Sequence, residues 1–266
     1  MPILNSIPRK PRASKRASRR PWLDRQLRLN LTAYNYKYSN LQLDFFRSDI
    51  FAFTTINAGS ARTKGIEFEF QVAPRALDGF DLHGSVNYNQ ARYGDAPGAP
   101  CWAGQTRGQG CNLVYVAANN GSRPFDPATD VIANRQNLRG QPTANAPDWT
   151  GNLGASYEAR FESGAKAAFA LDARYSGSYI ATAFGNPYTR QKRYMSLDGT
   201  ISFTTADEHW QLQLIGKNLT NRFYVIGGND TPNTGLGTGT NAGVIADQTG
   251  FASLPRTVQA QVTFRY

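Results

Sequence analysis

The side chains best suited to catalysis or metal binding are few in this sequence. It holds two histidines, His83 and His209, and two cysteines, Cys101 and Cys111. Neither histidine occurs in a pattern from which a nucleophile and its base could be assembled. The cysteines have nine residues between them and no histidine nearby, whereas a structural zinc site needs about four ligands. We therefore expect no catalytic residue, no metal site and no bound cofactor.

The segment 257–266 shows the kind of element that must position any functional side chain. Its apolar residues alternate with Thr, Gln and Arg. Because successive side chains of a strand point to opposite faces, such a strand has one apolar and one polar face. Transmembrane β-strands alternate in this way and place aromatic residues at the bilayer interfaces. The side chains expected to insert into a membrane are Val258, Val262, Phe264 and Tyr266.

The composition agrees with a transmembrane β-barrel and excludes a helical membrane protein. Of 266 residues, 40% are hydrophobic and the mean hydropathy is −0.49. No apolar run reaches the roughly 18 residues of a spanning helix. In a barrel only every second residue meets lipid, so the mean hydropathy stays low. Aromatic residues make up 12% of the chain, and 25 glycines and 14 prolines suit turns and long loops.

The net charge of +10 is concentrated in the first twenty residues, which hold seven Lys and Arg and no acid. We expect residues 1–22 to form a disordered basic segment, since they lack apolar periodicity. They do not resemble a secretory signal peptide, because no apolar stretch of adequate length occurs. A basic arm can bind nucleic acid or anionic headgroups. The alternative is that the arm reflects where the reading frame begins, and it is favoured because nothing downstream resembles a nucleic-acid module.

Seven further segments repeat the alternation, so the pattern predicts about eight antiparallel strands. They lie near 27–45, 66–72, 80–89, 149–158, 165–175, 195–203, 210–217 and 257–266. A slip in the pattern at Asn218 predicts a bulge. The connections alternate in length, with turns near 74–79, 161–164 and 206–209 and loops near 47–56, 94–147, 182–191 and 227–254. This asymmetry is that of outer-membrane barrels, whereas soluble β-sandwiches usually have shorter strands and more equal turns.

Four motifs, in order, resemble those of TonB-dependent outer-membrane receptors. They are NAGSARTKGIE at 57–67, APDWT at 146–150, KNLTNRFY at 217–224 and PRT at 255–257. The resemblance covers about residues 22–266 and identifies residues 23–266 as the C-terminal part of a receptor barrel, with a long loop at 94–147. Receptors of this family close about 22 strands around an N-terminal plug.

The resemblance implies active uptake of a scarce ligand across the outer membrane of a Gram-negative bacterium. Ferric siderophores are the family's usual ligands, and cobalamin, haem and oligosaccharides are those of other members. The implied partners are outer-membrane lipid and the TonB complex, which acts through a plug that is not encoded here. Two alternatives remain open. One is a structural or adhesin-like barrel without transport, and the other is a soluble, basic-armed β-sandwich that binds polyanions.

The resemblance also suggests roles for residues of the long loop. In an oxidising cell envelope, Cys101 and Cys111 are expected to form a disulfide that staples the loop. Aromatic and cationic side chains there are candidate ligand contacts, although each is equally explained as ordinary loop surface. They are Trp102, Arg107, Tyr115, Arg123 and Arg135.

About eight strands are too few for such a receptor, so we expect an open, curved sheet. A self-closed barrel of eight strands must fill its interior with side chains. The residues expected to face inward are small: Ser85, Ser156, Ala168, Ala170, Ser196, Thr200 and Ser202. The first and last strands should therefore lie far apart.

Overall fold

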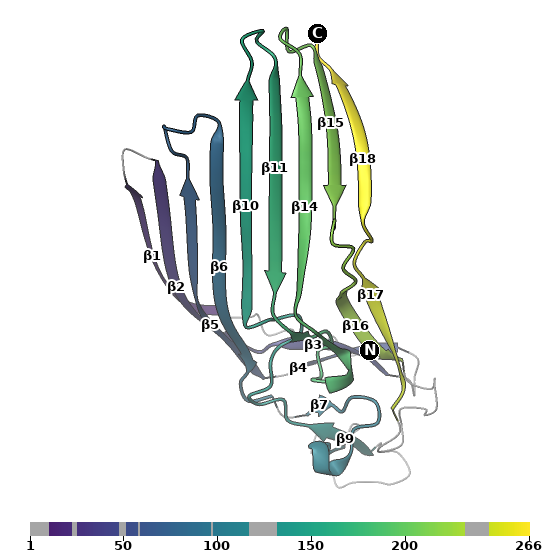
Figure 1. The fold of residues 1–266 in the computed structure, drawn as a ribbon. Helices are drawn as coiled ribbons and strands as arrows, with labels where there is room; N and C mark the ends of the chain where they lie inside the picture. The colour runs from purple at the N-terminus through teal and green to yellow at the C-terminus, as the bar shows by residue number, and fades with distance from the viewer. Residues whose placement is uncertain are drawn as a thin grey trace.

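The computed structural model describes residues 11–22, 26–47, 52–57, 59–96, 98–116, 132–231 and 245–266. Its main element is one antiparallel sheet of nine strands (Figure 1), in the order β1-β2-β5-β6-β10-β11-β14-β15-β18. The strands are β1 (Pro11–Trp22), β2 (Leu27–Ser39), β5 (Ser60–Val72), β6 (Phe80–Tyr93), β10 (Trp149–Arg160), β11 (Lys166–Ser176), β14 (Tyr194–Thr204), β15 (Trp210–Lys217) and β18 (Thr257–Phe264). Each pairs with the next in this order, so the sheet is an up-and-down meander.

The strand register gathers the apolar side chains on one face of the sheet. Phe169 is the partner of Ile201, and Ile201 is the partner of Leu214. Directly opposed residues of antiparallel strands share a face. These side chains are open to the surroundings, and Ile201 is 56% exposed. We call this surface the apolar face and the opposite surface the polar face. No second large sheet covers the apolar face in the described residues, so the β-sandwich alternative is wrong.

The two ends of the sheet differ as the sequence predicts. Short turns at 73–79, 161–165 and 205–209 join strands at one end, the turn end (Figure 1). Four long connections lie at the other, the loop end. We name them the first (40–59), second (94–148), third (177–193) and fourth (218–256) long loops. The expected placement of loops and turns on opposite sides is confirmed.

The long loops contain secondary structure that the sequence pattern does not predict. Their elements are β3 (Gln42–Arg47), β4 (Ala52–Asn57), β7 (Ala99–Pro100), η1 (Arg107–Gln109), β8 (Leu113–Val116), β9 (Ile132–Gln136), β12 (Tyr179–Ile180), η2 (Pro187–Thr189), β13 (Arg190–Gln191), β16 (Val225–Thr231) and β17 (Asp247–Ala252). Within the described residues β7, β9 and β8 form a small sheet, and β3–β4, β12–β13 and β16–β17 form pairs. The expectation that 94–147 lacks structure is therefore wrong.

Two strand ends differ from the expected ones because asparagines adopt left-handed backbone angles. Asn40 has φ 55° and separates β2 from β3, so the first strand does not continue to residue 45. Asn218 has φ 48°, which ends β15 in a turn instead of the expected bulge. Asparagine tolerates this conformation better than most residues other than glycine.

The expectation that residues 1–22 are disordered is wrong for Pro11–Trp22. This segment is strand β1, paired along its whole length with β2. Disorder was inferred from composition alone, whereas the edge of β2 supplies backbone partners to any extended segment beside it. Arg16 lies opposite Ala33 and Ser18 opposite Leu31, so β1 places polar residues on the apolar face. Residues 1–10 lie outside the described part of the chain.

The sheet is open, as expected, although it has nine strands instead of eight. β1 and β18 form its two edges and have no mutual pairing. Since all eight pairings between them are antiparallel, β1 and β18 run in the same direction (Figure 1).

The buried core lies in the long loops and not in the sheet. Tyr93, Ala96, Ala99 and Leu138 form a buried cluster, against which Leu41, Leu43 and Phe184 pack. These residues come from the end of β6 and the first three long loops. The sheet itself is one layer with two accessible faces.

Candidate functional site

On the polar face, His83 links two carboxylates across the sheet. Its Nδ1 lies 3.0 Å from Asp81 Oδ1, and its Nε2 lies 3.4 Å from Asp172 Oδ1. His83 is on β6 and Asp172 on β11, with Gly154 of β10 between them. A Cβ on Gly154 would lie 2.4 Å from both His83 Nε2 and Asp172 Oδ1. Because Gly154 has no side chain, the space between the strands is open to the contact of His83 with Asp172.

A second charge cluster lies beside the first. Asp198 is the register partner of Asp172. Its Oδ2 lies 3.4 Å from Arg174 Nη2 and 3.3 Å from Lys217 Nζ. Its Oδ1 accepts a hydrogen bond of 2.8 Å from the backbone N–H of Asn218. Acids and bases on this part of the polar face are thus paired with each other.

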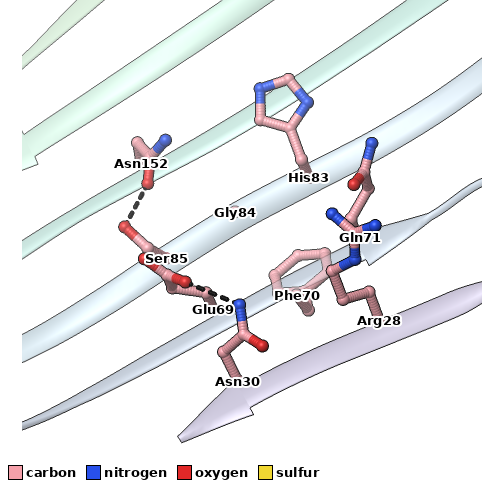
Figure 2. A pocket seen from close by; sticks show the side chains of 9 residues that line it. All are labelled: Arg28, Asn30, Glu69, Phe70, Gln71, His83, Gly84, Ser85 and Asn152. Atoms are coloured by element: carbon pink, nitrogen blue, oxygen red, sulfur yellow. Dashed lines mark hydrogen bonds between the residues drawn. The ribbon is translucent and has the colours of Figure 1, made fainter. Parts of the chain in front are cut away.

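A shallow hollow of about 360 Å³ lies on the polar face around Gly84 (Figure 2). Asn30 donates a hydrogen bond of 2.9 Å to Glu69, and Ser85 donates one to Asn152. The lining residues are Arg28, Asn30, Glu69, Phe70, Gln71, His83, Gly84, Ser85 and Asn152. We call it the wall hollow.

A larger hollow of about 650 Å³ lies toward the loop end, and we call it the mouth hollow. Four of its lining residues are tyrosines, Tyr175, Tyr179, Tyr194 and Tyr224. The rings of Tyr194 and Tyr224 stack with centroids 3.9 Å apart and planes 10° apart. Tyr179 donates a hydrogen bond of 2.5 Å to the carbonyl of Val225. Burial raises the pKa of Tyr179 further above neutral pH, at which a tyrosine hydroxyl is already protonated and can donate.

The two hollows form one polar track, because Ser85 and Asn152 line both. Arg174, 65% exposed, adds a guanidinium to the mouth hollow. Tyrosine rings, amides and a guanidinium can recognise planar, oxygen-rich and anionic groups. In the described residues, no group of three or more His, Cys, Asp and Glu is placed to hold a metal ion. The arrangement is suited to binding such planar, oxygen-rich and anionic groups.

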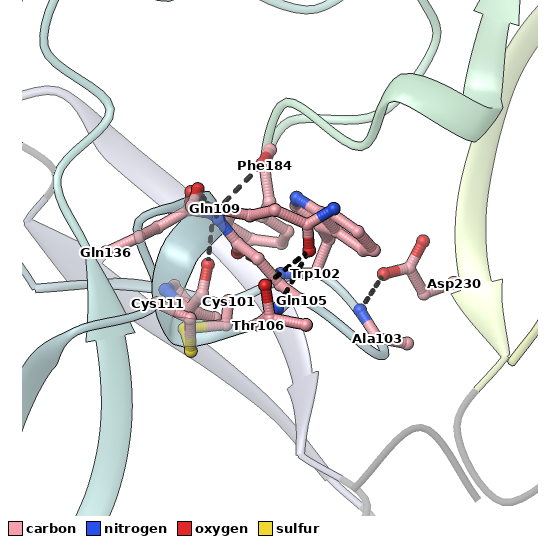
Figure 3. The surroundings of a disulfide bond; sticks show 11 residues. Cys101, Trp102, Ala103, Gln105, Thr106, Gln109, Cys111, Gln136, Phe184 and Asp230 are labelled. Atoms are coloured by element: carbon pink, nitrogen blue, oxygen red, sulfur yellow. Dashed lines mark hydrogen bonds between the residues drawn. A yellow bond between two sulfur atoms is a disulfide. The ribbon is translucent and has the colours of Figure 1, made fainter. Parts of the chain in front are cut away.

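The structure joins Cys101 and Cys111 in a disulfide with Cα atoms 5.6 Å apart (Figure 3). The turn that it closes holds Trp102, which is 5% exposed and packs edge-on against Tyr188 at 5.7 Å. So little exposed ring leaves Trp102 unsuited to the ligand contact expected of it, and its role here is packing. The sequence did not reveal this, because burial in the turn depends on other loops.

Of the other expected ligand contacts, the structure describes the side chains of Arg107 and Arg135, and they lie in different elements. Arg107 is exposed in η1, and Arg135 lies in β9, half-buried and with a partner of its own. Tyr115 belongs to β8, for which only the backbone is described, and Arg123 lies outside the described residues. Neither Arg107 nor Arg135 lines either hollow.

The expected membrane-facing residues of the last strand lie on the apolar face. Val258 and Val262 are opposite Gly216 and Leu212, and both are 61% exposed. Phe264 packs against Trp210 with centroids 4.6 Å apart, and Tyr266 contacts Phe264 at 5.2 Å. They form an aromatic group at the turn end.

Sequence reasoning missed the residues that line the mouth hollow. Tyr194 and Arg174 occupy polar-face positions near the loop end, which the alternation alone could have revealed. Tyr179 and Tyr224 belong to the third and fourth long loops, so only the folded loops bring them to the hollow.

These features define the class of protein. One apolar face, one polar face, short turns at one end and long loops at the other are the features of a transmembrane β-barrel. The open sheet is a segment of such a barrel. Across the described residues, no helix combines the length and apolar character needed to cross a membrane.

The chain belongs to the family of the TonB dependent receptor-like β-barrel, whose model matches residues 16–219. No curated protein sequence matches it significantly. The fold resembles solved receptors at low sequence identity. The ferric yersiniabactin uptake receptor of Yersinia pestis has a TM-score of 0.62 and 14% identity, over 96% of this chain and 30% of that one.

Two further solved structures agree. The siderophore receptor of Acinetobacter baumannii gives a TM-score of 0.59 at 14% identity, covering 96% of this chain and 28% of that one. The iron transporter of Neisseria meningitidis gives 0.56 at 11% identity, covering 98% and 32%. This chain therefore spans about a third or less of the length of these structures.

Proposed function

We propose that this chain forms part of the barrel wall and ligand entrance of a TonB-dependent receptor for a ferric siderophore. The receptor would lie in the outer membrane of a Gram-negative bacterium, with the apolar face toward lipid. TonB would act through a plug domain outside this sequence. The chain would bind and guide the ligand without catalysing a reaction.

The observation that carries this proposal is the mouth hollow. Stacked rings of Tyr194 and Tyr224 beside the Arg174 guanidinium offer surfaces for a planar, anionic chelate. The hollow continues into the wall hollow through Ser85 and Asn152, so a ligand has a polar path away from the loops. The names of the similar structures, a ferric yersiniabactin receptor among them, point to the same ligand class.

Binding to single chains held in lipid nanodiscs tests the proposal. The probes are ferric complexes of a catecholate, a hydroxamate and a phenolate siderophore, followed by quenching of protein fluorescence. We expect saturable quenching by at least one probe. Tyr194→Ala should weaken it about tenfold, since truncating an aromatic anchor commonly costs more than 1 kcal/mol.

Met195→Ala is the matched control, because Met195 is the next residue of β14 and lies on the apolar face at 51% exposure. It should bind like the unmodified chain. Absence of saturable binding for all three probes, or equal losses in both variants, would reject the mouth hollow as a siderophore site. The latter result would favour a structural barrel without transport.

A further inference from the structure

Asp230 of β16 joins three long loops through its carboxylate. Its Oδ2 accepts a hydrogen bond of 2.6 Å from the backbone N–H of Ala103, inside the disulfide-closed turn of the second loop (Figure 3). Its Oδ1 accepts one of 2.8 Å from the side-chain amide of Asn186, in the third loop. Asp230 itself belongs to the fourth loop. One side chain thus contacts segments that are 127 and 44 residues away in sequence.

The side chain of Asn186 is held in the orientation in which its amide donates to this carboxylate. It is 0% exposed, and its side-chain oxygen accepts a hydrogen bond from the N–H of Tyr188. Its amide nitrogen, held in that orientation, donates to Asp230 and also to Gln248 at 3.2 Å. A buried polar side chain must be satisfied, since an unpaired group costs free energy.

Other contacts within the second loop, and from that loop and the end of β6 to the third loop, support the junction. The side chain of Gln136 donates to the carbonyls of Pro100 and Phe184, at 2.7 and 2.9 Å. The hydroxyl of Tyr93 donates to the carbonyl of Ala183 at 3.0 Å. The second and third loops are therefore already in contact, and Asp230 adds the fourth.

We propose that Asp230 is a positioning residue that locks the second, third and fourth long loops into one cap before any ligand arrives. The disulfide-closed turn is then a fixed part of this cap and not a lid that swings over the entrance. The third and fourth loops also carry Tyr179 and Tyr224 of the mouth hollow, so the lock fixes the spacing of two of its four tyrosines. The inference goes beyond uptake, and its test involves no ligand.

Amide hydrogen exchange of the full chain, with its disulfide intact, measures the lock directly. In Asp230→Asn only one oxygen remains to accept, so either the Ala103 N–H or the Asn186 amide loses its partner. In Asn186→Asp two carboxylates face each other. Each substitution should speed exchange in the segment 101–106 about tenfold or more, the change expected for loss of a hydrogen bond to a charged group.

The double variant Asp230→Asn with Asn186→Asp exchanges the two groups and should restore the lock. The amide at position 230 then donates to the carboxylate at 186, while its oxygen still accepts from Ala103. Slow exchange in the double variant would show coupling between the loops, which general damage to folding would not produce. The strands β10 and β11 provide the internal check, because their exchange should be equal in all variants.

Asp247→Asn is the matched control, since Asp247 lies in β17 of the same hairpin but is exposed. It should leave exchange in 101–106 unchanged. Three results would overturn the proposal: fast exchange at 101–106 in the unmodified chain, no effect of Asp230→Asn, or a double variant as fast as the faster single variant.

Discussion

Gly154 has no side chain, yet it controls whether charges on the polar face can meet across the sheet. His83 and Asp172 belong to strands that are not neighbours, so their contact must pass over β10. Because the residue at the crossing point is a glycine, no Cβ stands between the two side chains. At position 154, therefore, a residue without a side chain permits the contact between His83 and Asp172.

Gly154→Ala should break the link between His83 and Asp172, because the new Cβ would lie 2.4 Å from both side chains. Both contacted atoms are at the ends of flexible, partly exposed side chains that can move aside, so the cost is that of losing an exposed ion pair, roughly 0.2–1 kcal/mol. The free energy of unfolding, from urea titration of the chain in lipid vesicles, measures the loss. Ser156→Ala, on the same face of β10, should change it far less. Equal stability of Gly154→Ala and the unmodified chain would show that the link contributes nothing.

At the scale of the strand, the apolar face is best tested with two neighbouring positions of β14. Ile201 lies on the apolar face and Thr200 on the polar face. Ile201→Arg places a charge toward lipid, which costs about 2–4 kcal/mol near the bilayer midplane. Thr200→Arg should cost much less, since the polar face is hydrated. Urea titration in lipid vesicles compares them, and equal losses would contradict the assigned orientation of the sheet.

The eight strands with regular alternation could be predicted from the sequence, because a period of two sustained over a long segment is typical of a β-strand with two unlike faces. β1 could not, since its pairing depends on the free edge of β2 and not on its own residues. The small sheets in the loops were also missed. They are held by contacts such as Gln136 with Phe184, which no local pattern records.

In the candidate site, too, some residues are placed by the strand alternation and others by contacts between loops. Arg174 and Tyr194 lie at positions that the alternation assigns to the polar face, so their location could be predicted from the sequence. Asp230 and Asn186 were not, because their meeting requires two folded loops. Trp102 was chosen for its aromatic ring, and its burial reflects packing against Tyr188, a residue of the third loop.

At the scale of the whole molecule, the edges of the sheet carry backbone groups without strand partners in the described residues. Unpaired edges are templates for pairing with other chains. We expect the chain in detergent micelles to associate as its concentration rises, measured by sedimentation velocity. A monodisperse monomer at all concentrations would contradict this expectation.

Two proline variants of β18 locate the association. Successive backbone N–H groups of a strand point to opposite sides, so only one of Ala260 and Gln261 directs its N–H to the free edge. Proline removes that donor. Ala260→Pro and Gln261→Pro should therefore differ, one reducing association and the other weakening the pairing with β15. Identical association of both variants would place the contact elsewhere.

The shared direction of β1 and β18 sets a rule of parity for any barrel that contains this sheet. Joining the two edges directly would create a parallel pair, and so would a ring of identical copies related by rotation about the barrel axis. Pairing β18 with β18 of a second copy would be antiparallel, but it would turn that copy upside down in the membrane. An all-antiparallel barrel must therefore insert an odd number of strands between β18 and β1, and copies of this sheet that share its orientation in the membrane cannot supply them.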